Sequence, residues 1–416
     1  MVGLKSLHVW LFAAPMVFLG GWGMAQGPEG FRPQTPDELP SSGRTGSATN
    51  RSGSDASGLN RPSQRNSRSS SSRDTYVRVS RAPNMFGDTL TPQVAYSPFK
   101  GPSGQDQYGN LNAFNAPLGG GGSFNVSENN TAIPTDRVYF VYNAFYSSVS
   151  TSVGFGPNGP IQQSSNLYRY LMGFEKTFFD GNASIDVRMP LLSGFQFENN
   201  SYSSDLGNVG NLTMYLKGLL YADDNSALAT GLGIGLPTGS DLHTRSSFSP
   251  NTEFVTIQNQ TVNLMPFVAS TFAPNDRWFV QSFGQLLFNT SGDNVVNQTG
   301  SVGVFNQQNL LQADLGVGRW LWKDSTRPYF TGLAGVFELH YTSTMQNSDV
   351  VRLPPGFLGG EVYNSANRLD LLNLTSGVHT QLGPMSTLRV GAVVPLKESP
   401  DRVFDSELQV SFNRRF

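Results

Sequence analysis

The chain of 416 residues contains no cysteine, which excludes disulfide bonds, thiolate metal sites and a lipid anchor on an N-terminal cysteine. Charged residues are scarce at 14%, whereas a soluble globular domain carries about a quarter. Beyond the N-terminus, no uninterrupted apolar run reaches the roughly 20 residues that a transmembrane helix needs. The net charge of −2 gives no indication of a nucleic-acid partner.

Residue patterns for catalysis are also lacking. The four histidines form no H-E-x-x-H metal motif, and the sequence has neither a G-x-S-x-G elbow nor a P-loop. His340 and His379 are expected on neighbouring strands with Ser376 and Thr342 nearby, which gives a weak indication of a membrane hydrolase. Such pairs are more often satisfied polar contacts. We therefore predict a protein that is not an enzyme and that uses no metal or cofactor.

The first 25 residues have the pattern of a secretory signal. Lys5 supplies a positive charge, residues 7–19 are mostly apolar, and Gly23-Met24-Ala25 offers small residues for cleavage. We expect the mature chain to begin at Gln26, after export across the inner membrane.

Two further segments precede any regular pattern. Residues 26–81 are too poor in apolar side chains to build a core, so we predict disorder. Within them, 41–81 holds eight arginines and two aspartates, a local charge of +6. This basic stretch is either a solvated linker, which we favour, or a contact for peptidoglycan, another anionic polymer or a membrane surface. Residues 82–136 carry scattered aromatics among proline and glycine, and are either a plug for the following domain or more linker.

From Arg137 onward, segments of roughly ten residues alternate between apolar and polar side chains, the length and period of strands that cross a bilayer. The alternation predicts an all-β fold, a transmembrane antiparallel β-barrel of about twelve strands over 137–416. The predicted strands are 137–149, 167–178, 183–192, 209–221, 227–237, 261–273, 277–288, 308–321, 328–342, 368–382, 386–396 and 403–416.

The connections alternate between short and long. Asp180-Gly181 predicts a two-residue hairpin turn of the primed type, and four other connections on the same side are tight. Those on the opposite side are mostly long and polar. An even strand count with turns on one side and loops on the other is typical of outer-membrane barrels, and it places both ends of the barrel on the periplasmic side.

The two faces of each strand predict which side chains meet lipid and which line the lumen. In 183–191, the odd positions are apolar, while Ser184, Asp186 and Arg188 lie between them. A β-sandwich would carry more lysine and glutamate on its polar face. The residues predicted to line the lumen are Arg169, Glu175, Asp186, Arg188, Lys217, Gln281, Asp314, Glu338, His340, His379, Arg389 and Glu407.

These side chains carry charges of both signs, and two interpretations remain open. They select solutes by charge, or they form ion pairs that fill the interior. Barrels of about eight strands are filled by their own side chains, and those of 16–18 leave an aqueous channel, so twelve strands leave a narrow or partly plugged passage. The inward face of 228–237 consists of Ala229, Gly231, Gly233 and Gly235. These small residues make space for a pore or for something packed on the wall. A nucleotide-binding role is not expected, because the spacing is not G-x-G-x-x-G and no helix follows.

The C-terminus resembles the assembly signal of outer-membrane barrels. Leu408, Val410, Phe412 and Phe416 share one face of the last strand, and Arg414 is the departure on that face. We expect outer-membrane lipid and the barrel assembly machinery as partners, because the last strand of a barrel must close against the first.

Two stretches resemble known families: RYLMGFEKTFFDGNASIDVRMP at 169–190 and GLGIGLPTG at 231–239. Together with APNMFGD at 82–88, they resemble outer-membrane barrel proteins of planctomycete bacteria over residues 82–416. The second stretch also resembles the transporter-like family named for the meta-pathway of phenol degradation. The resemblance implies an outer-membrane barrel of transporter type and supplies no catalytic residues.

The function predicted from the sequence is passage of a small solute through a mixed-charge lumen, gated by loops 193–208, 238–260 and 343–367. The alternative is a structural or adhesive outer-membrane protein with a closed lumen that binds through its long loops.

Overall fold

The computed structural model describes residues 78–87, 94–97, 114–116, 124–156, 159–193, 196–198, 202–205, 207–246, 251–354, 360–364 and 366–416. The predicted signal sequence and residues 26–77 lie outside these ranges. The described residues are almost entirely β-structure, with one short 3₁₀ helix at Val79–Arg81. No helix among them combines the length and apolar character required to cross a membrane.

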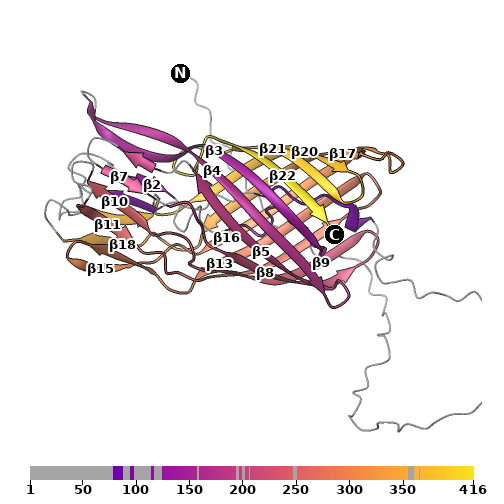
Figure 1. Ribbon diagram of the computed structural model, residues 1–416, viewed down its shortest axis with the longest axis horizontal. Helices are drawn as coiled ribbons and strands as arrows, with labels where there is room; N and C mark the ends of the chain where they lie inside the picture. The colour runs from indigo at the N-terminus through magenta and orange to yellow at the C-terminus, as the bar shows by residue number, and fades with distance from the viewer. Residues whose placement is uncertain are drawn as a thin grey trace, which may run out of the picture. The chain divides into compact units, whose positions relative to one another are not determined.

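Twelve strands form a closed antiparallel barrel (Figure 1), which confirms the predicted strand count and fold class. Closure is made by β3, which pairs with β4 on one side and with β22 on the other. The barrel strands are β3 (Arg137–Gly156), β4 (Gly159–Phe178), β5 (Ala183–Ser193), β8 (Thr213–Ala222), β9 (Ser226–Gly235), β12 (Asn263–Phe272), β13 (Trp278–Asn289), β16 (Leu310–Lys323), β17 (Phe330–Thr344), β20 (Asp370–Leu382), β21 (Ser386–Pro395) and β22 (Ser406–Arg415).

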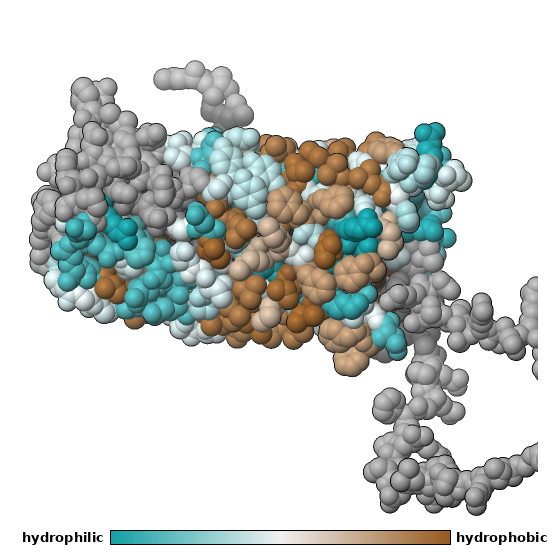
Figure 2. Space-filling model, viewed as in Figure 1, coloured by the Kyte–Doolittle hydropathy of each residue, from teal (hydrophilic) through white to brown (hydrophobic). Residues whose placement is uncertain are grey.

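The barrel wall is apolar outside, and its inner face carries both polar and apolar side chains. Along β16, buried and exposed residues alternate: Gln312 and Asp314 are buried, whereas Leu311, Leu315 and Val317 are exposed. Apolar residues gather over the barrel strands in Figure 2, and hydrophilic ones dominate the sheet at the left. Contiguous apolar surface of this kind is unfavourable in water and matches the lipid-facing band of a membrane barrel.

We call the two ends of the barrel the turn end and the loop end. The turn end holds the short connections and Phe416, at the right of Figure 1. At the loop end, the structure corrects the predicted length of the first connection. β3 extends to Gly156 and β4 begins at Gly159, so most of the predicted loop 150–166 is strand. The alternation that guided the prediction ends there because a strand beyond the lipid has no apolar face to present.

The long connections also contain strands of their own. Six of them form a separate sheet at the left of Figure 1: β6 (Gln196–Glu198), β7 (Tyr202–Asp205), β10 (Leu242–Ser246), β11 (Glu253–Ile257), β14 (Asp293–Asn297) and β15 (Gly300–Phe305). Two more strands of a long connection, β18 (Val350–Leu353) and β19 (Gly360–Asn364), extend the barrel sheet from β3 together with two strands that precede the barrel, β1 (Val94–Ser97) and β2 (Phe114–Ala116). An apolar cluster that includes Tyr96, Phe254 and Phe305 gives the loop end a core of its own.

The turn between β4 and β5 differs from the predicted two-residue type. Phe178 pairs with Ala183, so the connection has four residues, and three of them have positive φ: Phe179 (51°), Asp180 (56°) and Gly181 (85°). The Phe179 ring packs edge-on against Phe178 at 5.0 Å. The sequence identified the reversal but missed Phe179, because a bulky residue with positive φ is unusual.

We expect Gly181→Ala to lower the free energy of unfolding by about 1–2 kcal/mol, because a Cβ is strained at this φ. Gly218→Ala is the matched control, since the nearest atom to its added Cβ, a carbonyl oxygen, lies 3.9 Å away. Denaturant unfolding in lipid vesicles measures both. Equal stability of the two variants would contradict the strain at Gly181.

Two parts of the chain before β3 lie inside the barrel. We call the described residues 78–87 and 124–136 the inner segment. Its apolar side chains Met85, Phe86, Phe124 and Val126 are at most 1% exposed and belong to one cluster with wall residues such as Phe267. The chain then passes directly into β3, so the inner segment and the barrel share one core.

Candidate functional site

The interior between the wall and the inner segment is the candidate site. All twelve side chains predicted to line the lumen lie on inward strand faces, and none is more than 5% exposed. Burial of a charge is costly unless a partner compensates it, so the question at each position is which group provides the partner.

An acidic group on β16 and β17 holds both parts of the inner segment. The Glu338 carboxylate accepts the backbone N–H of Phe86 at 2.9 and 3.0 Å and that of Gly87 at 3.1 Å. Asp314 accepts the Asn125 amide at 2.9 Å. His340 lies between them, with Nδ1 2.7 Å from Asp314 and Nε2 3.4 Å from Glu338.

Arg389 on β21, two strands along the wall from Glu338 on β17, binds the same region. Its guanidinium donates to the carbonyl oxygens of Asn84 (2.7 Å) and Met85 (2.6 Å) and to the Asn129 side chain (2.6 Å). The guanidinium also lies 4.8 Å from the centre of the Phe86 ring. The buried positive charge of Arg389 is thus stabilised by carbonyl and amide oxygens rather than by a carboxylate at hydrogen-bond distance, because hydrogen bonds from a charged donor are strong.

Phe86 occupies a space left by two glycines. Gly377 and Gly391 are paired across β20 and β21. A Cβ at Gly377 would stand 2.5 Å from the Phe86 ring, and one at Gly391 would stand 2.8 Å from it. Only glycine at these positions lets the ring approach the wall so closely.

A basic group on β4, β5 and β8 holds residues 125–131. Arg169 forms an ion pair with Glu128 of the inner segment. Arg188 donates to the carbonyl oxygens of Asn125 (3.2 Å) and Val126 (3.4 Å). Lys217 donates to the Asn130 side chain and to the Thr131 carbonyl, each at 2.9 Å.

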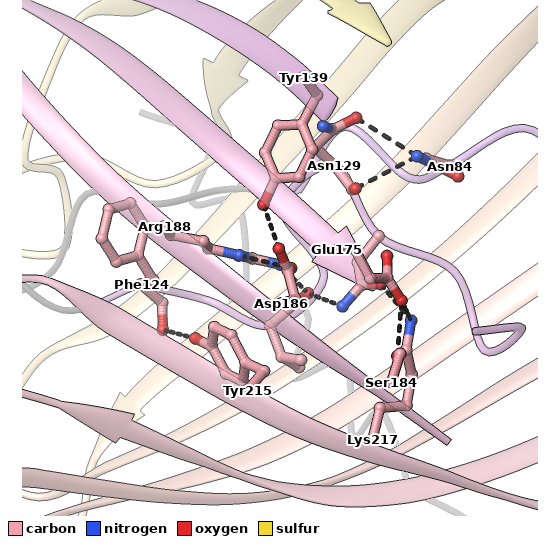
Figure 3. A network of polar contacts seen from close by, with 12 residues as sticks. Asn84, Phe124, Asn129, Tyr139, Glu175, Ser184, Asp186, Arg188, Tyr215 and Lys217 are labelled. Atoms are coloured by element: carbon pink, nitrogen blue, oxygen red, sulfur yellow. Dashed lines mark hydrogen bonds and ion pairs between the residues drawn. The ribbon is translucent and has the colours of Figure 1, made fainter. Parts of the chain in front are cut away.

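Other charges are paired within the wall. Glu175 accepts Arg137 Nε at 2.7 Å, Lys217 Nζ at 2.9 Å and the Ser184 hydroxyl at 2.7 Å (Figure 3). Asp186 accepts the Tyr139 hydroxyl at 2.7 Å and pairs with Arg188 at 3.0 Å. The charges thus pair among themselves and also bind the inner segment, whereas selection of solutes by charge, the other interpretation made from the sequence, stays a prediction.

Gln281, Glu407 and His379 likewise have weak links to the inner segment or none described. Gln281 donates to Thr131 at 3.4 Å, and Glu407 accepts Asn143 of the neighbouring strand at 2.6 Å. The His379 ring packs edge-on against Trp320 at 5.6 Å. Ser376 is exposed on the outward face, so the hydrolase arrangement considered from the sequence does not form.

Sequence reasoning missed two important contacts. Gln285 accepts the Val126 N–H at 2.8 Å and donates to the Phe124 carbonyl at 2.9 Å, and Tyr215 donates to the same carbonyl at 3.1 Å. Gln285 shares its strand face with Gln281, so the alternation already contained that signal. Tyr215 was hidden because an aromatic residue at an inward position resembles a lipid-facing one.

The glycine-rich face of β9 makes space for aromatic side chains. A Cβ at Gly233 would meet the Tyr215 ring at 2.5 Å, and one at Gly231 would meet Phe267 at 2.6 Å. These two rings pack edge-on at 5.9 Å. Of the two uses predicted for these glycines, the structure thus has them accommodate packed side chains.

The residues predicted as an assembly signal lie on the outer face of β22. Leu408, Phe412 and Phe416 are 36–54% exposed. The Phe416 ring stacks on Phe174 at 5.9 Å, and its backbone N–H donates to the Asp136 carbonyl at 3.4 Å.

Asp136 links this end of the chain to β4. Its carboxylate accepts the backbone N–H and the hydroxyl of Thr177 at 2.6 and 2.7 Å, and pairs with Lys176 at 3.1 Å. Partial burial alone would raise the Asp136 pKa, but these hydrogen bonds and the nearby ammonium outweigh it and lower the pKa below its usual value.

Within the described residues, no group of three or more His, Asp or Glu side chains has the arrangement of a metal site. Neither a family model nor a curated protein sequence matches the chain.

Solved structures with a similar arrangement of strands are outer-membrane proteins. An outer membrane channel from Pseudomonas putida is 14% identical, with a TM-score of 0.41, over 69% of this chain and 97% of that one. The NanC porin is 8% identical, with a TM-score of 0.37, over 67% and 98%. The Pseudomonas putida toluene transporter TodX is 10% identical, with a TM-score of 0.34, over 68% and 90%. At these identities and scores the similarity assigns no function to this chain.

Proposed function

We propose that the protein is an outer-membrane channel for small solutes, in which the inner segment sets how far the lumen is open. The observation that carries this proposal is that a separate segment fills the interior, held by wall side chains such as Glu338, Arg389 and Arg188. A barrel of this size is wider than its own side chains fill. Removal of the segment would therefore leave a water-filled, polar lumen.

The outer surface of the barrel indicates which cell structures the protein would contact. The exposed apolar face of the strands is suited to lipid, and the turn end would face the periplasm. The outer face of β22 would be presented to the barrel assembly machinery. The basic stretch 41–81 would act as a linker or would contact peptidoglycan or another anionic polymer of the cell wall.

Conductance of the purified protein in planar bilayers tests the channel. We expect a variant lacking residues 26–136 to show discrete steps on the order of tenfold larger than those of the full chain, because conductance follows the water-filled cross-section. A variant lacking 26–77 is the matched control, since it retains the inner segment and should conduct like the full chain.

Folding of each variant is verified by heat-modifiable migration in gels. Arg389→Ala provides a second route, because it loosens the inner segment without shortening the chain. If both the deletion variant and Arg389→Ala fold and neither conducts more than the full chain, the channel proposal is wrong.

A second function is favoured by the loop end. The six-stranded sheet and the core around Tyr96 and Phe305 form an ordered platform, which suits a structural or adhesive protein with a closed lumen. This alternative predicts silent bilayers for every variant, together with binding to a partner that is lost when the sheet is removed.

A further inference from the structure

A small pocket opens at the turn end, beside the point where the inner segment leaves the barrel. It has a volume of about 50 Å³ and lies between the inner segment and the ends of β16, β20, β21 and β22. Its charged and titratable lining consists of Arg81, Arg137, Arg415 and His379, and no carboxylate lines it. Asn84, Gln381, Thr387 and Asn413 complete the polar part of the lining.

Two buried nitrogen atoms in this lining have no hydrogen-bond partner among the described residues. Arg137 is 1% exposed and is fixed by Glu175 at Nε and by the Asn129 carbonyl at Nη1. Its Nη2 is one of the two atoms, and it lies 4.0 Å from a carboxylate oxygen of Asp186. The other is Nδ1 of His379, a residue that is 5% exposed. A buried unpaired polar group costs about 1–3 kcal/mol, so a ligand that pairs with both would be favoured.

Two further cations are available at the rim. The side chains of Arg81 and Arg415 make no hydrogen bond or ion pair with the described part of the chain, unlike the neighbouring Arg78, which pairs with Asp224 at 3.1 Å. Guanidinium groups bind planar and tetrahedral oxyanions through pairs of N–H donors.

We propose that this pocket binds a small oxyanion, a phosphate or carboxylate group, between Arg81, Arg137, Arg415 and His379. The volume admits one such group rather than a large solute. Arg137 and His379 would supply fixed, buried donors, and Arg81 and Arg415 would close over the ligand from the partly exposed side. The site does not depend on whether the barrel conducts.

Calorimetric titration of the full chain in a non-ionic detergent, at constant ionic strength in sodium chloride, tests the site. We expect saturable binding of inorganic phosphate. Removing one arginine should raise Kd about tenfold, the effect of one charge-assisted hydrogen bond. Arg81→Gln and Arg415→Gln are the test variants. Arg414→Gln is the matched control, because Arg414 is exposed on the outward face one residue from Arg415.

A parallel titration with acetate separates the two ligand types: tighter phosphate binding indicates a phosphate site and tighter acetate binding a carboxylate site. Saturable binding of either anion that weakens in both test variants and not in the control supports the proposal. Binding of neither anion beyond the effect of chloride, or equal Kd values in all variants, would overturn it. Both test residues are partly exposed, so the variants should fold, and heat-modifiable migration verifies this.

Discussion

Replacing Glu338 by glutamine is expected to release the inner segment from the wall. The carboxylate accepts the N–H groups of both Phe86 and Gly87, and a glutamine amide would direct an N–H group at these donors. Breaking a buried charge interaction from one side costs about 3–5 kcal/mol. Hydrogen exchange of the Phe86 and Gly87 amides should therefore accelerate on the order of a hundredfold to a thousandfold, because exchange follows the population of the released state.

Glu407→Gln is the matched control for this change. Glu407 is also buried on an inward strand face, but it accepts Asn143 of the wall. Its substitution should leave the exchange at Phe86 and Gly87 unchanged. Similar exchange rates in Glu338→Gln and the unmodified protein would show that other contacts, such as those of Arg389, hold the segment alone.

Replacing Gly377 by valine is expected to displace Phe86 by steric conflict. The first added atom would stand 2.5 Å from the Phe86 ring, and overpacking of this kind costs about 1–3 kcal/mol. Phe86→Ala alone should cost about 3–5 kcal/mol through the cavity that it leaves. In the double variant the valine partly fills that cavity, so the combined loss should fall short of the sum by about 1–3 kcal/mol.

Denaturant unfolding in vesicles measures the four stabilities of this cycle. Gly335→Val is the control, because Gly335 has open space around its added Cβ, with the nearest atom at 3.9 Å on the Leu321 side chain. A strictly additive double variant would contradict direct packing of Phe86 on Gly377.

How much of this arrangement the sequence predicts depends on which physical constraint acts on a residue. Lipid on one side of each strand requires an apolar face, and that requirement reveals the twelve strands and the inward position of residues such as Asp314 and Glu338. Beyond the lipid the constraint disappears, and the strands within the long connections were missed for that reason.

Partner choice has no comparable signal in the sequence. Phe86 binds Glu338 and packs between Gly377 and Gly391, but no spacing or period connects these distant positions. The sequence therefore predicts that charges line the interior, whereas the identity of the group that neutralises each charge depends on the folded chain. Gln285 illustrates both points: the sequence predicts that its side chain faces inward, but not that it binds the backbone of Phe124 and Val126.

The pairing of β3 with β22 has a consequence for the order of biogenesis. Each of the other pairings in the barrel wall joins one of the twelve wall strands to the next wall strand along the chain, whereas this one joins the first wall strand to the last. The inner segment passes directly into β3, so it can lie against the open sheet before closure, and no free chain end has to be threaded through a finished barrel. Enclosure of the segment and closure of the wall are then one event, which cannot occur until β22 has been delivered to the membrane.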